Sequence, residues 1–395
     1  MKNIAIINVM NIKSTGKIAL NLLNQLTDKG YNVTFFYGRG EKSNDPRQIR
    51  FESRFEVLVH AFLSRLTGLQ GFFSCFATRR LVKEMKKRNT DTVILLNPHA
   101  YYLNERVFYS YVSKSNLRFI YIVPDEYAFL GKCSGNPGCE RFKTGKGKCP
   151  NIHRYPESWL FDTCPIVMKG KEKNYKNINR AKFVGPEFVI NHLKQSFLGQ
   201  FMPTAVLDEA IDISLYQPRD AKKLRQELGI SEEKVIILCI APPYKKIEYF
   251  KQVAEKLKYN EKYIFIHVGK DDAVTQGNYI HVNFVKENSD LALYYSMADL
   301  FLFTSMGDTM SNACLEALAC GTPLLTFNIS GMPYLMDNSV GTMVEPGNVE
   351  QLVKIVEKTE KKTPDIMKRC RTYAEGRYDM NKYSDKLLDI AKGIK

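Results

Sequence analysis

The chain has 395 residues, of which 44% are hydrophobic and 25% charged, and its formal net charge is +15. This length is sufficient for two domains, and the composition is ordinary for a globular protein. No stretch approaches the roughly 20 consecutive apolar residues of a membrane-spanning helix, which argues against an integral membrane protein. The excess of basic residues favours anionic partners, namely phosphorylated substrates, anionic lipid or nucleic acid.

The first forty residues predict a β-α-β unit. Residues 4–9 form an apolar run that is broken by Asn8 and followed by no small-residue cleavage site, so we expect a first strand instead of a signal peptide. A cytoplasmic protein without disulfides follows from that expectation. Residues 13–16 are expected to be a loop, a helix follows up to Gly30, and residues 32–37 form the second strand.

Residues 51–88 carry two apolar stripes at helical spacing, and the second ends in a basic run. We expect both stripes to pack into the core. The alternative is that these aromatic faces, bordered by Lys and Arg, lie on an anionic membrane surface. The stripes consist of Phe55, Leu58, Val59, Phe62, Leu63 and Leu66, and of Phe72, Phe73, Phe76, Leu81 and Met85.

Further strands at 92–96 and 119–123 continue the pattern of a parallel sheet with helices on both faces. A cysteine-containing insertion follows at about 130–165. Its four thiols could hold zinc, but the spacing lacks the paired C-x2-C of a strong zinc signature, so we expect a free-thiol loop and no metal. These thiols belong to Cys133, Cys139, Cys149 and Cys164.

A proline-containing stretch at 202–220 marks a boundary near residue 205. We therefore predict an α/β protein with two doubly wound, Rossmann-like domains at 1–205 and 206–378. A helix at 379–395 is expected to pack back toward the first domain. Ligands of such folds bind outside the carboxyl ends of the strands, in the cleft that two facing domains would leave.

The second domain is predicted to contain strands and helices in alternation. The expected strands are 235–241, 263–268, 279–282, 300–304, 324–327 and 342–344, and the expected helices are about 246–258, 289–297, 312–320, 349–359 and 380–393.

Residues 307–323 are the most informative segment. They link two apolar runs and read as loop, helix and turn, with Ser311 or Asn312 as the N-cap and Cys320-Gly321 at the helix end. The backbone N–H groups at such a helix start suit a phosphate. Asp308 and Glu316 lie eight positions apart, and carboxylates so placed accept hydrogen bonds from sugar hydroxyls. The segment therefore favours a nucleotide-sugar over a bare phosphate.

This segment resembles the signature of retaining GT-B glycosyltransferases of the family 4 type, also called group 1, in the branch of colanic-acid and capsule biosynthesis. In that family the first acid contacts the donor sugar and the second the ribose. Asp308 replaces the commoner Glu and is one methylene shorter. The family's first-domain His before an Asp is absent here, where the sequence reads Pro124-Asp125-Glu126, and Asp125 is left to supply a polar contact.

The resemblance also implies roles for other segments. Residues 13–16 match a Gly-Ser-Thr-Gly loop near the donor phosphates and the acceptor, with Lys in place of the first Gly. Lys245 and Lys246 stand where the family has an Arg and a Lys that neutralise the pyrophosphate. The implied catalytic residues are Lys246, Lys245, Asp308, Glu316 and Asp125. The implied donor-binding residues are Lys245, Lys246, Asp308 and Glu316 together with Gly16, Thr15, Thr309, Met310 and Ser311. The implied acceptor-side residues are Lys13, Ser14, His99 and Tyr101.

The resemblance implies a hexosyltransferase that uses a UDP- or GDP-linked sugar, retains the anomeric configuration and requires no cofactor. The acceptor would be a hydroxyl of a saccharide or lipid-linked substrate, in surface polysaccharide or glycolipid assembly at the inner face of the cell membrane. Two alternatives remain: a nucleotide-sugar epimerase of the same fold, and a nonenzymatic binder of anions or nucleic acid. No recognisable nucleic-acid motif supports the last, so we expect no nucleic-acid partner.

Overall fold

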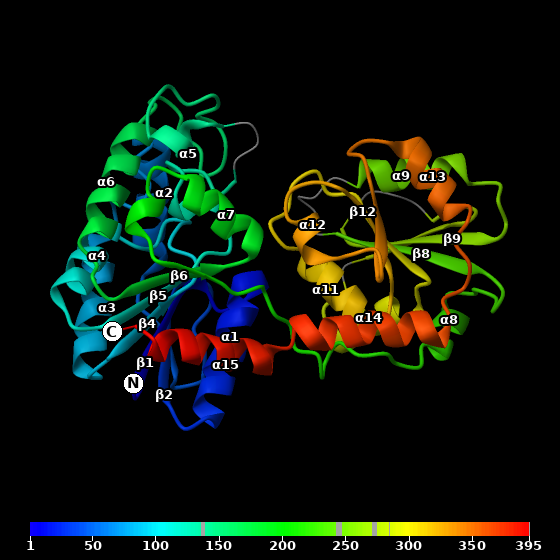
Figure 1. Ribbon diagram of the computed structural model, residues 1–395, viewed down its shortest axis with the longest axis horizontal. Coiled ribbons are helices and arrows are strands. Elements are labelled where there is room, and N and C mark those ends of the chain that lie inside the picture. Colours follow the sequence, from blue (N-terminus) through cyan, green and yellow to red (C-terminus); the bar gives the residue numbers. More distant parts are fainter. Residues whose placement is uncertain (136–138, 242–246, 271–274, 284, 395) are drawn as a thin grey trace. The chain divides into compact units, whose positions relative to one another are not determined.

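A computed structural model describes residues 1–135, 139–241, 247–270, 275–283 and 285–394, without the side chains of Lys13 and Ser14. The chain divides into two compact units, shown in Figure 1. Unit 1 comprises Met1–Asp208 together with Asn381–Lys395, and unit 2 comprises Glu209–Met380. Each unit is a parallel β-sheet flanked by helices, as the apolar runs and helical stripes predict.

Unit 1 contains a seven-stranded sheet in the order β3-β2-β1-β4-β5-β6-β7, and its paired strands are parallel. The strands are β1 (Asn3–Met10), β2 (Asn32–Arg39), β3 (Gln48–Arg50), β4 (Thr92–Leu95), β5 (Arg118–Ile122), β6 (Ala181–Gly185) and β7 (Thr204–Val206). Three strands, the edge strands β3 and β7 and the neighbouring β6, are additions to the prediction. They are short, and their sequences carry too few apolar residues to stand out.

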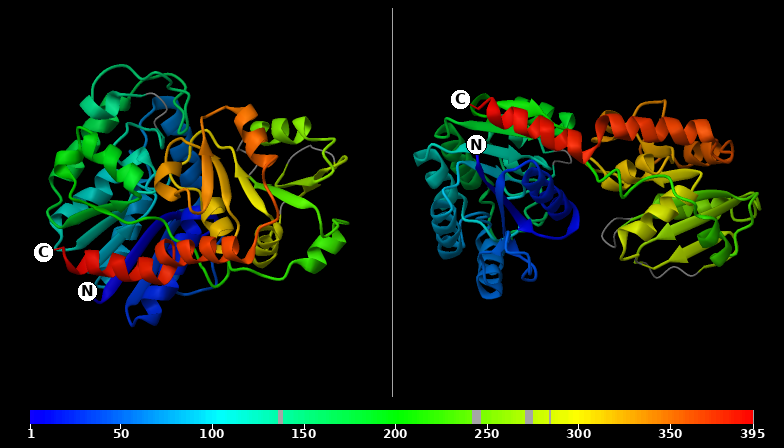
Figure 2. Two further views of the ribbon diagram at one scale, coloured as in Figure 1. Left: turned by 45° about the vertical axis from the view of Figure 1, so that its right-hand side comes forward. Right: turned by 90° about the horizontal axis from the view of Figure 1, so that it is seen from below.

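The helices of unit 1 cover both faces of this sheet. Figure 1 shows α3, α4 and α6 side by side along one face. Lys29 of α1 forms an ion pair with Asp385 of α15, and Figure 2 shows α15 lying along this unit. The helices are α1 (Lys13–Asp28), α2 (Arg54–Thr67), α3 (Cys75–Lys87), α4 (Glu105–Lys114), the 3-10 turn η1 (Glu126–Ala128), α5 (Arg141–Thr144), α6 (Cys164–Lys176), α7 (Glu187–Gln195), the 3-10 turn η2 (Gly199–Phe201) and α15 (Met380–Lys392).

Unit 2 contains a six-stranded parallel sheet in the order β10-β9-β8-β11-β12-β13. Helices α9 and α13 pack together on one face, and α11 packs on α14 on the other (Figure 1). The strands are β8 (Val235–Ile240), β9 (Tyr263–Val268), β10 (Tyr279–Val282), β11 (Leu300–Phe303), β12 (Leu324–Phe327) and β13 (Gly341–Val344). The helices are α8 (Lys222–Glu227), α9 (Glu248–Lys256), α10 (Asn288–Met297), α11 (Asn312–Ala319), α12 (Met332–Leu335), α13 (Val349–Val356) and α14 (Pro364–Arg377).

The expected loop at residues 13–16 is wrong, because these residues form the first turn of α1. Only two residues separate the end of β1 from the start of the helix, so the backbone at Gly16 passes close to the end of that strand. A Cβ atom at Gly16 would lie 2.9 Å from the carbonyl carbon of Asn11 and 3.0 Å from the carbonyl oxygen of Met10. Glycine is therefore required here by a close approach and not by a turn.

The expected core packing of the stripe on α2 is also wrong. Phe55 is 74% exposed, Leu58 68% and Phe62 52%, whereas His60 and Ser64 are buried on the opposite face. The polar face of α2 points inward because buried polar groups of unit 1 bind it there: His60 Nδ1 lies 2.7 Å from the hydroxyl of Ser74. In α3 the expectation holds for Leu81 and Met85, which are fully buried, but Phe76 is 72% exposed.

Candidate active site

Loops of unit 2 gather where strands β8, β9, β11 and β12 end, because parallel strands place their carboxyl ends at one edge of the sheet. The loop at 304–311 follows β11 and leads directly into α11. Ser311 occupies the N-cap position with extended backbone and is buried. The first N–H groups of a helix have no partner within it, so this edge presents donors and the positive end of a helix dipole.

Glu316 is a buried carboxylate at this edge, in the second turn of α11. Its position is about 6 Å along the helix axis from Asn312. The residue is 7% exposed, and its Oε2 accepts a hydrogen bond of 2.8 Å from the hydroxyl of Tyr295 on α10. Burial, followed by the charge of Glu316, raises the pKa of Tyr295 well above its ordinary value. The tyrosine therefore stays a donor, and it fixes the orientation of the carboxylate.

The loop that carries Asp308 is held by the segment after β12. The backbone N–H of Gly331 donates to the carbonyl oxygen of Asp308 over 3.0 Å. A Cβ atom at position 331 would lie 1.6 Å from the carbonyl oxygen of Thr309, so a side chain there would displace the loop. Asp308 and Thr309 are half-buried, while Met310 is buried. The structure thus places Asp308, Thr309, Met310, Ser311 and Glu316 in one continuous strand-loop-helix segment.

The two lysines expected to bind the pyrophosphate, Lys245 and Lys246, lie outside the described residues. They follow Ala241, at the end of β8, which is the neighbour of β11 in the sheet.

The carboxyl edge of the unit 1 sheet brings His99 and Asp125 together from the loops after β4 and β5. His99 Nε2 lies 2.9 Å from Asp125 Oδ2, and the His99 side chain is 8% exposed. The other carboxylate oxygen of Asp125 accepts from the backbone N–H of Tyr127 over 2.9 Å. Sequence reasoning assigned these two residues to different sets, and the fold joins them into a pair.

Tyr101 stands beside this pair on a strained backbone. Ala100 and Tyr101 have φ angles of 75° and 69°, a left-handed conformation that costs non-glycine residues free energy and is concentrated at functional sites. The Arg39 guanidinium holds this turn by donating to the carbonyl oxygen of Ala100 over 3.0 Å. Arg65 lies over the Tyr101 ring, 5.2 Å from its centroid. Burial raises the pKa of Tyr101 to about 12, so its hydroxyl remains protonated.

Tyr155 is a candidate residue that the sequence did not indicate. Its ring centroid lies 6.4 Å from those of both His99 and Tyr101, and the residue is 50% exposed. It belongs to the irregular insertion after η1, where no periodicity or motif marks a position. A half-exposed loop tyrosine whose ring meets the His99 and Tyr101 rings in edge-type contacts is suited to packing against a sugar.

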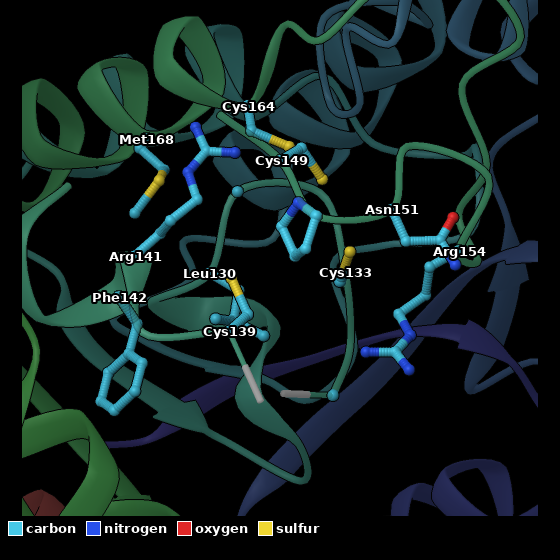
Figure 3. Close-up of a pocket in the computed structure, with 13 residues that line it drawn as sticks. Leu130, Cys133, Cys139, Arg141, Phe142, Cys149, Asn151, Arg154, Cys164 and Met168 are labelled. Atoms are coloured by element: carbon cyan, nitrogen blue, oxygen red, sulfur yellow. The ribbon is translucent and has the colours of Figure 1, made fainter. Parts of the chain in front are cut away.

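The start of α1 lies at the same edge of unit 1. Asn8 donates to the hydroxyl of Thr15 over 3.2 Å and to the carbonyl oxygen of Met10 over 2.8 Å, which ties the first turn of α1 to the end of β1. Gly16 and Thr15 thus belong to the carboxyl edge of β1, while the side chains of Lys13 and Ser14 are not described. The four insertion cysteines line a separate pocket of unit 1 (Figure 3).

Comparison with known proteins places this geometry in context. Residues 220–377 match the family described as glycosyl transferases group 1. The putative colanic acid biosynthesis glycosyl transferase WcaC of Escherichia coli is 22% identical over 356 residues, which cover 86% of each chain. Alpha-monoglucosyldiacylglycerol synthase of Acholeplasma laidlawii is 23% identical over 326 residues, covering 77% of this chain and 73% of the relative.

Among solved structures, HepE of Anabaena in complex with UDP and glucose has a TM-score of 0.67 at 13% sequence identity. The alignment covers 99% of this chain and all of that one. This similarity confirms the predicted fold class, two Rossmann-like parallel-sheet domains of the GT-B type.

Proposed function

We propose that this chain, whose residues 220–377 match the group 1 glycosyltransferase family, transfers a hexose from a nucleotide-diphosphate sugar to a hydroxyl acceptor. The product would be a surface polysaccharide or a glycolipid. The observation that carries the proposal is the buried Glu316 carboxylate, held by Tyr295 one turn inside the helix that follows the loop 304–311. A carboxylate at that place, behind a helix N-terminus, matches a nucleoside diphosphate at both its sugar and its phosphate ends.

In this proposal the unit 2 edge binds the donor. Glu316 accepts hydrogen bonds from the ribose hydroxyls, the N-terminus of α11 and Lys245 with Lys246 neutralise the diphosphate, and Asp308 binds a hydroxyl of the transferred sugar. Helix dipole and lysines supply the charge that a metal ion supplies in other transferases, so no cofactor is required. Similarity to HepE, solved with UDP and glucose, supports a UDP-linked donor.

The unit 1 edge is proposed to receive the acceptor and the reacting end of the donor sugar. Asp125 fixes the ring of His99, which supplies the polar contact that the family obtains from a histidine next to the aspartate. Tyr155 provides aromatic surface beside it, and the buried Tyr101 packs against the Tyr155 ring. Thr15 and Gly16 lie at the same edge, and the family resemblance assigns them to the donor and Lys13 with Ser14 to the acceptor. None of the described side chains of this edge is placed as a nucleophile, which favours a front-face retaining transfer over a covalent intermediate.

The direct test is a panel of UDP- and GDP-sugars incubated with the protein, with and without bacterial lipid extract. We expect nucleoside diphosphate release that depends on the acceptor, and NMR of the product should show the anomeric configuration of the donor. A modified sugar nucleotide formed without acceptor would instead identify an epimerase. Absence of turnover with every donor and acceptor would contradict the proposal.

We further propose that the exposed face of α2 binds the membrane that carries the acceptor. Phe55, Leu58 and Phe62 project from this helix, and the Trp159 ring packs edge-on against Phe62 at 6.0 Å. On α3, Arg79 lies over the exposed ring of Phe76. Apolar side chains bordered by cations bind an anionic bilayer both by burying apolar surface and by charge attraction. None of the described helices is long and apolar enough to cross a membrane, so this binding would be peripheral.

Vesicle flotation tests this surface. We expect the protein to float with phosphatidylglycerol vesicles at low salt and to float less at high salt, because salt screens the charge attraction. The double variant Phe55→Ser with Leu58→Ser should hardly float at all. Tyr259→Ser is the matched control, because Tyr259 is an 88% exposed aromatic residue of unit 2. Equal flotation of both variants would show that α2 is not the contact.

A further inference from the structure

The insertion between β5 and β6 brings four of the nine cysteines to one pocket. Cys133, Cys139, Cys149 and Cys164 all line it, although they are spread over 32 positions of the sequence. Figure 3 shows Cys133, Cys149 and Cys164 directed into a common space, with Cys139 at its edge. The enclosed volume is about 30 Å³, which is room for roughly one water-sized group.

Asp162 holds two of these cysteines side by side. One carboxylate oxygen accepts from the backbone N–H of Cys149 over 2.7 Å, and the other accepts from that of Cys164 over 3.2 Å. The two sulfur atoms and a carboxylate oxygen of Asp162 lie within 4.8 Å of one another. Because both carboxylate oxygens are already bound to backbone, Asp162 supports the ligands and the thiols are the groups left to bind an ion.

The surroundings suit a negatively charged thiolate cluster. Arg141 and Arg154 line the same pocket, and Arg141 Nη1 lies 3.5 Å from Asp162. Lys132 is buried and donates to the carbonyl oxygens of Arg154 and Pro156 over 2.8 Å each. Zinc bound by four thiolates carries a net charge of about −2, which these cations offset.

The insertion has little regular structure to hold its shape. Within its described residues, from Phe129 to Thr163, the only regular element is the four-residue helix α5. A cross-link stabilises a segment of this kind, and structural zinc is one such cross-link. All nine cysteines are unbridged, so a disulfide does not supply it.

We propose that Cys133, Cys139, Cys149 and Cys164 bind a structural zinc ion and that Asp162 positions two of them. The expectation of a free-thiol loop rested on the missing C-x2-C pair, and the bridging carboxylate of Asp162 replaces that pair as the device that holds two thiols together. The ligand shell is filled by protein, so the ion stabilises structure and takes no part in chemistry.

The zinc would hold both sides of the candidate acceptor site. Cys133 follows the turn that begins at Asp125, and the backbone N–H of Glu126 donates to the carbonyl oxygen of Ser134 over 3.2 Å. Lys171 fixes the intervening chain by donating to the carbonyl oxygens of Leu130 and Gly131. On the other side, the two carbonyl groups bound by Lys132 flank Tyr155. The metal would therefore fix the positions of Asp125 and Tyr155.

The test is elemental analysis of the full chain purified under reducing conditions. We expect about one zinc per chain in the wild type and in Cys239→Ser, a control that changes a buried cysteine of unit 2, and background zinc in Cys149→Ser. Cobalt(II) added to chelator-treated protein should give a thiolate-to-cobalt absorption band in the wild type and not in Cys149→Ser. This readout is independent of glycosyl transfer, so it stands or fails separately from the proposed function.

Asp162→Asn keeps all four thiols and guards against a variant that fails to fold. Loss of a group that orients metal ligands weakens binding by about 10- to 100-fold, which competition with a zinc chelator would measure. Zinc-free wild type with unchanged melting temperature, a Cys149–Cys164 disulfide found by mass spectrometry, or bound iron in place of zinc would each overturn the proposal.

Discussion

The carboxyl edges of the two sheets assemble their candidate residues in different ways. The edge of unit 2 takes them from one continuous segment, residues 304–316, in which strand, loop and helix follow each other directly. The edge of unit 1 takes them from separate loops: Thr15 after β1, His99 and Tyr101 after β4, Asp125 after β5, and Tyr155 from the insertion. A continuous segment keeps its spacing in the sequence, whereas a site made from separate loops exists only after folding.

This contrast suggests a division of tasks. The donor nucleotide presents the same ribose and diphosphate in every transferase that uses it, so one rigid segment on a helix suffices. Acceptors differ, and loops on separate strands can change independently. We therefore expect changes in unit 2 to affect donor binding and changes in unit 1 to affect transfer.

The largest effect is expected for Glu316→Gln. The substitution retains the volume and an acceptor for Tyr295 but removes the charge that we propose binds the ribose hydroxyls. Hydrogen bonds to a charged group contribute about 1.5–3 kcal/mol each, so kcat/KM should fall about 100-fold in a nucleoside diphosphate release assay. Glu255→Gln, which changes an ion-paired acid on the surface of α9, should leave kcat/KM unchanged. Similar values for both variants would remove Glu316 from the site.

The His99–Asp125 pair should behave as one unit. We expect Asp125→Asn and His99→Asn each to lower kcat about 10-fold while donor binding is unchanged. The kcat of the double variant should be no lower than that of the less active single variant, because the effects of groups that act together are not additive. A double-mutant cycle on kcat measures this coupling. Independent, multiplicative losses would show that the 2.9 Å contact is structural only.

Tyr295→Phe removes the hydroxyl that orients Glu316 and nothing else. One neutral-to-charged hydrogen bond is lost within a buried site, so the donor KM should rise by roughly 10-fold with little change in kcat. Phenylalanine preserves the packing of the ring against Phe301, 5.5 Å away between centroids. A fall in kcat with unchanged KM would indicate that Glu316 acts in the chemical step and not in donor binding.

The smallest effect on activity is expected for Glu52→Gln, beneath the unit 1 edge. Burial raises the pKa of Glu52 from 4.5 to about 8. The folded protein therefore binds more protons than the unfolded chain between these values, and the stability associated with a protonated Glu52 is present below pH 4.5 and lost as pH rises toward 8. The loss is at most about 1.4 kcal/mol per pH unit.

Urea unfolding at pH 5 and pH 8 measures this loss of stability. Glutamine cannot ionise, so the variant should gain stability relative to the wild type at pH 8 and gain less at pH 5. Its turnover should change less than about threefold, because Glu52 contacts Ser74 and not the His99–Asp125 pair. A gain that is equal at both pH values would mean that Glu52 is ionised throughout.

Much of the fold could be predicted from the sequence because its central strands are continuous apolar runs. β10 and β12 match their predicted bounds, and the central strands of both sheets lie within two residues of prediction. The short strands β3, β6 and β7 lack that signal. Helix α2 shows the limit of periodicity: its apolar stripe predicts a helix but not which face is buried, since inward His60 contacts Ser74, a partner that no local pattern reveals.

The candidate site can be predicted from the sequence only where its residues belong to one continuous segment. The spacing of residues 308–316 along the sequence predicts how they are arranged, and Ser311 is one of the two predicted N-cap residues. The meeting of His99 with Asp125, 26 positions apart, depends on β4 and β5 being neighbours in the sheet. Tyr155 lies in an irregular insertion held by side chain contacts to backbone, such as those of Lys132, and such contacts have no sequence period.

The central claim is that the unit 2 edge binds a nucleoside diphosphate through Glu316, and isothermal titration calorimetry of UDP and GDP with the full chain tests it most directly. We expect one of the two nucleotides to bind at a single site, with an affinity that falls at least 10-fold in Glu316→Ala and stays unchanged in His99→Asn. Equal affinity of the wild type and Glu316→Ala, or loss of binding in His99→Asn alone, would contradict the account.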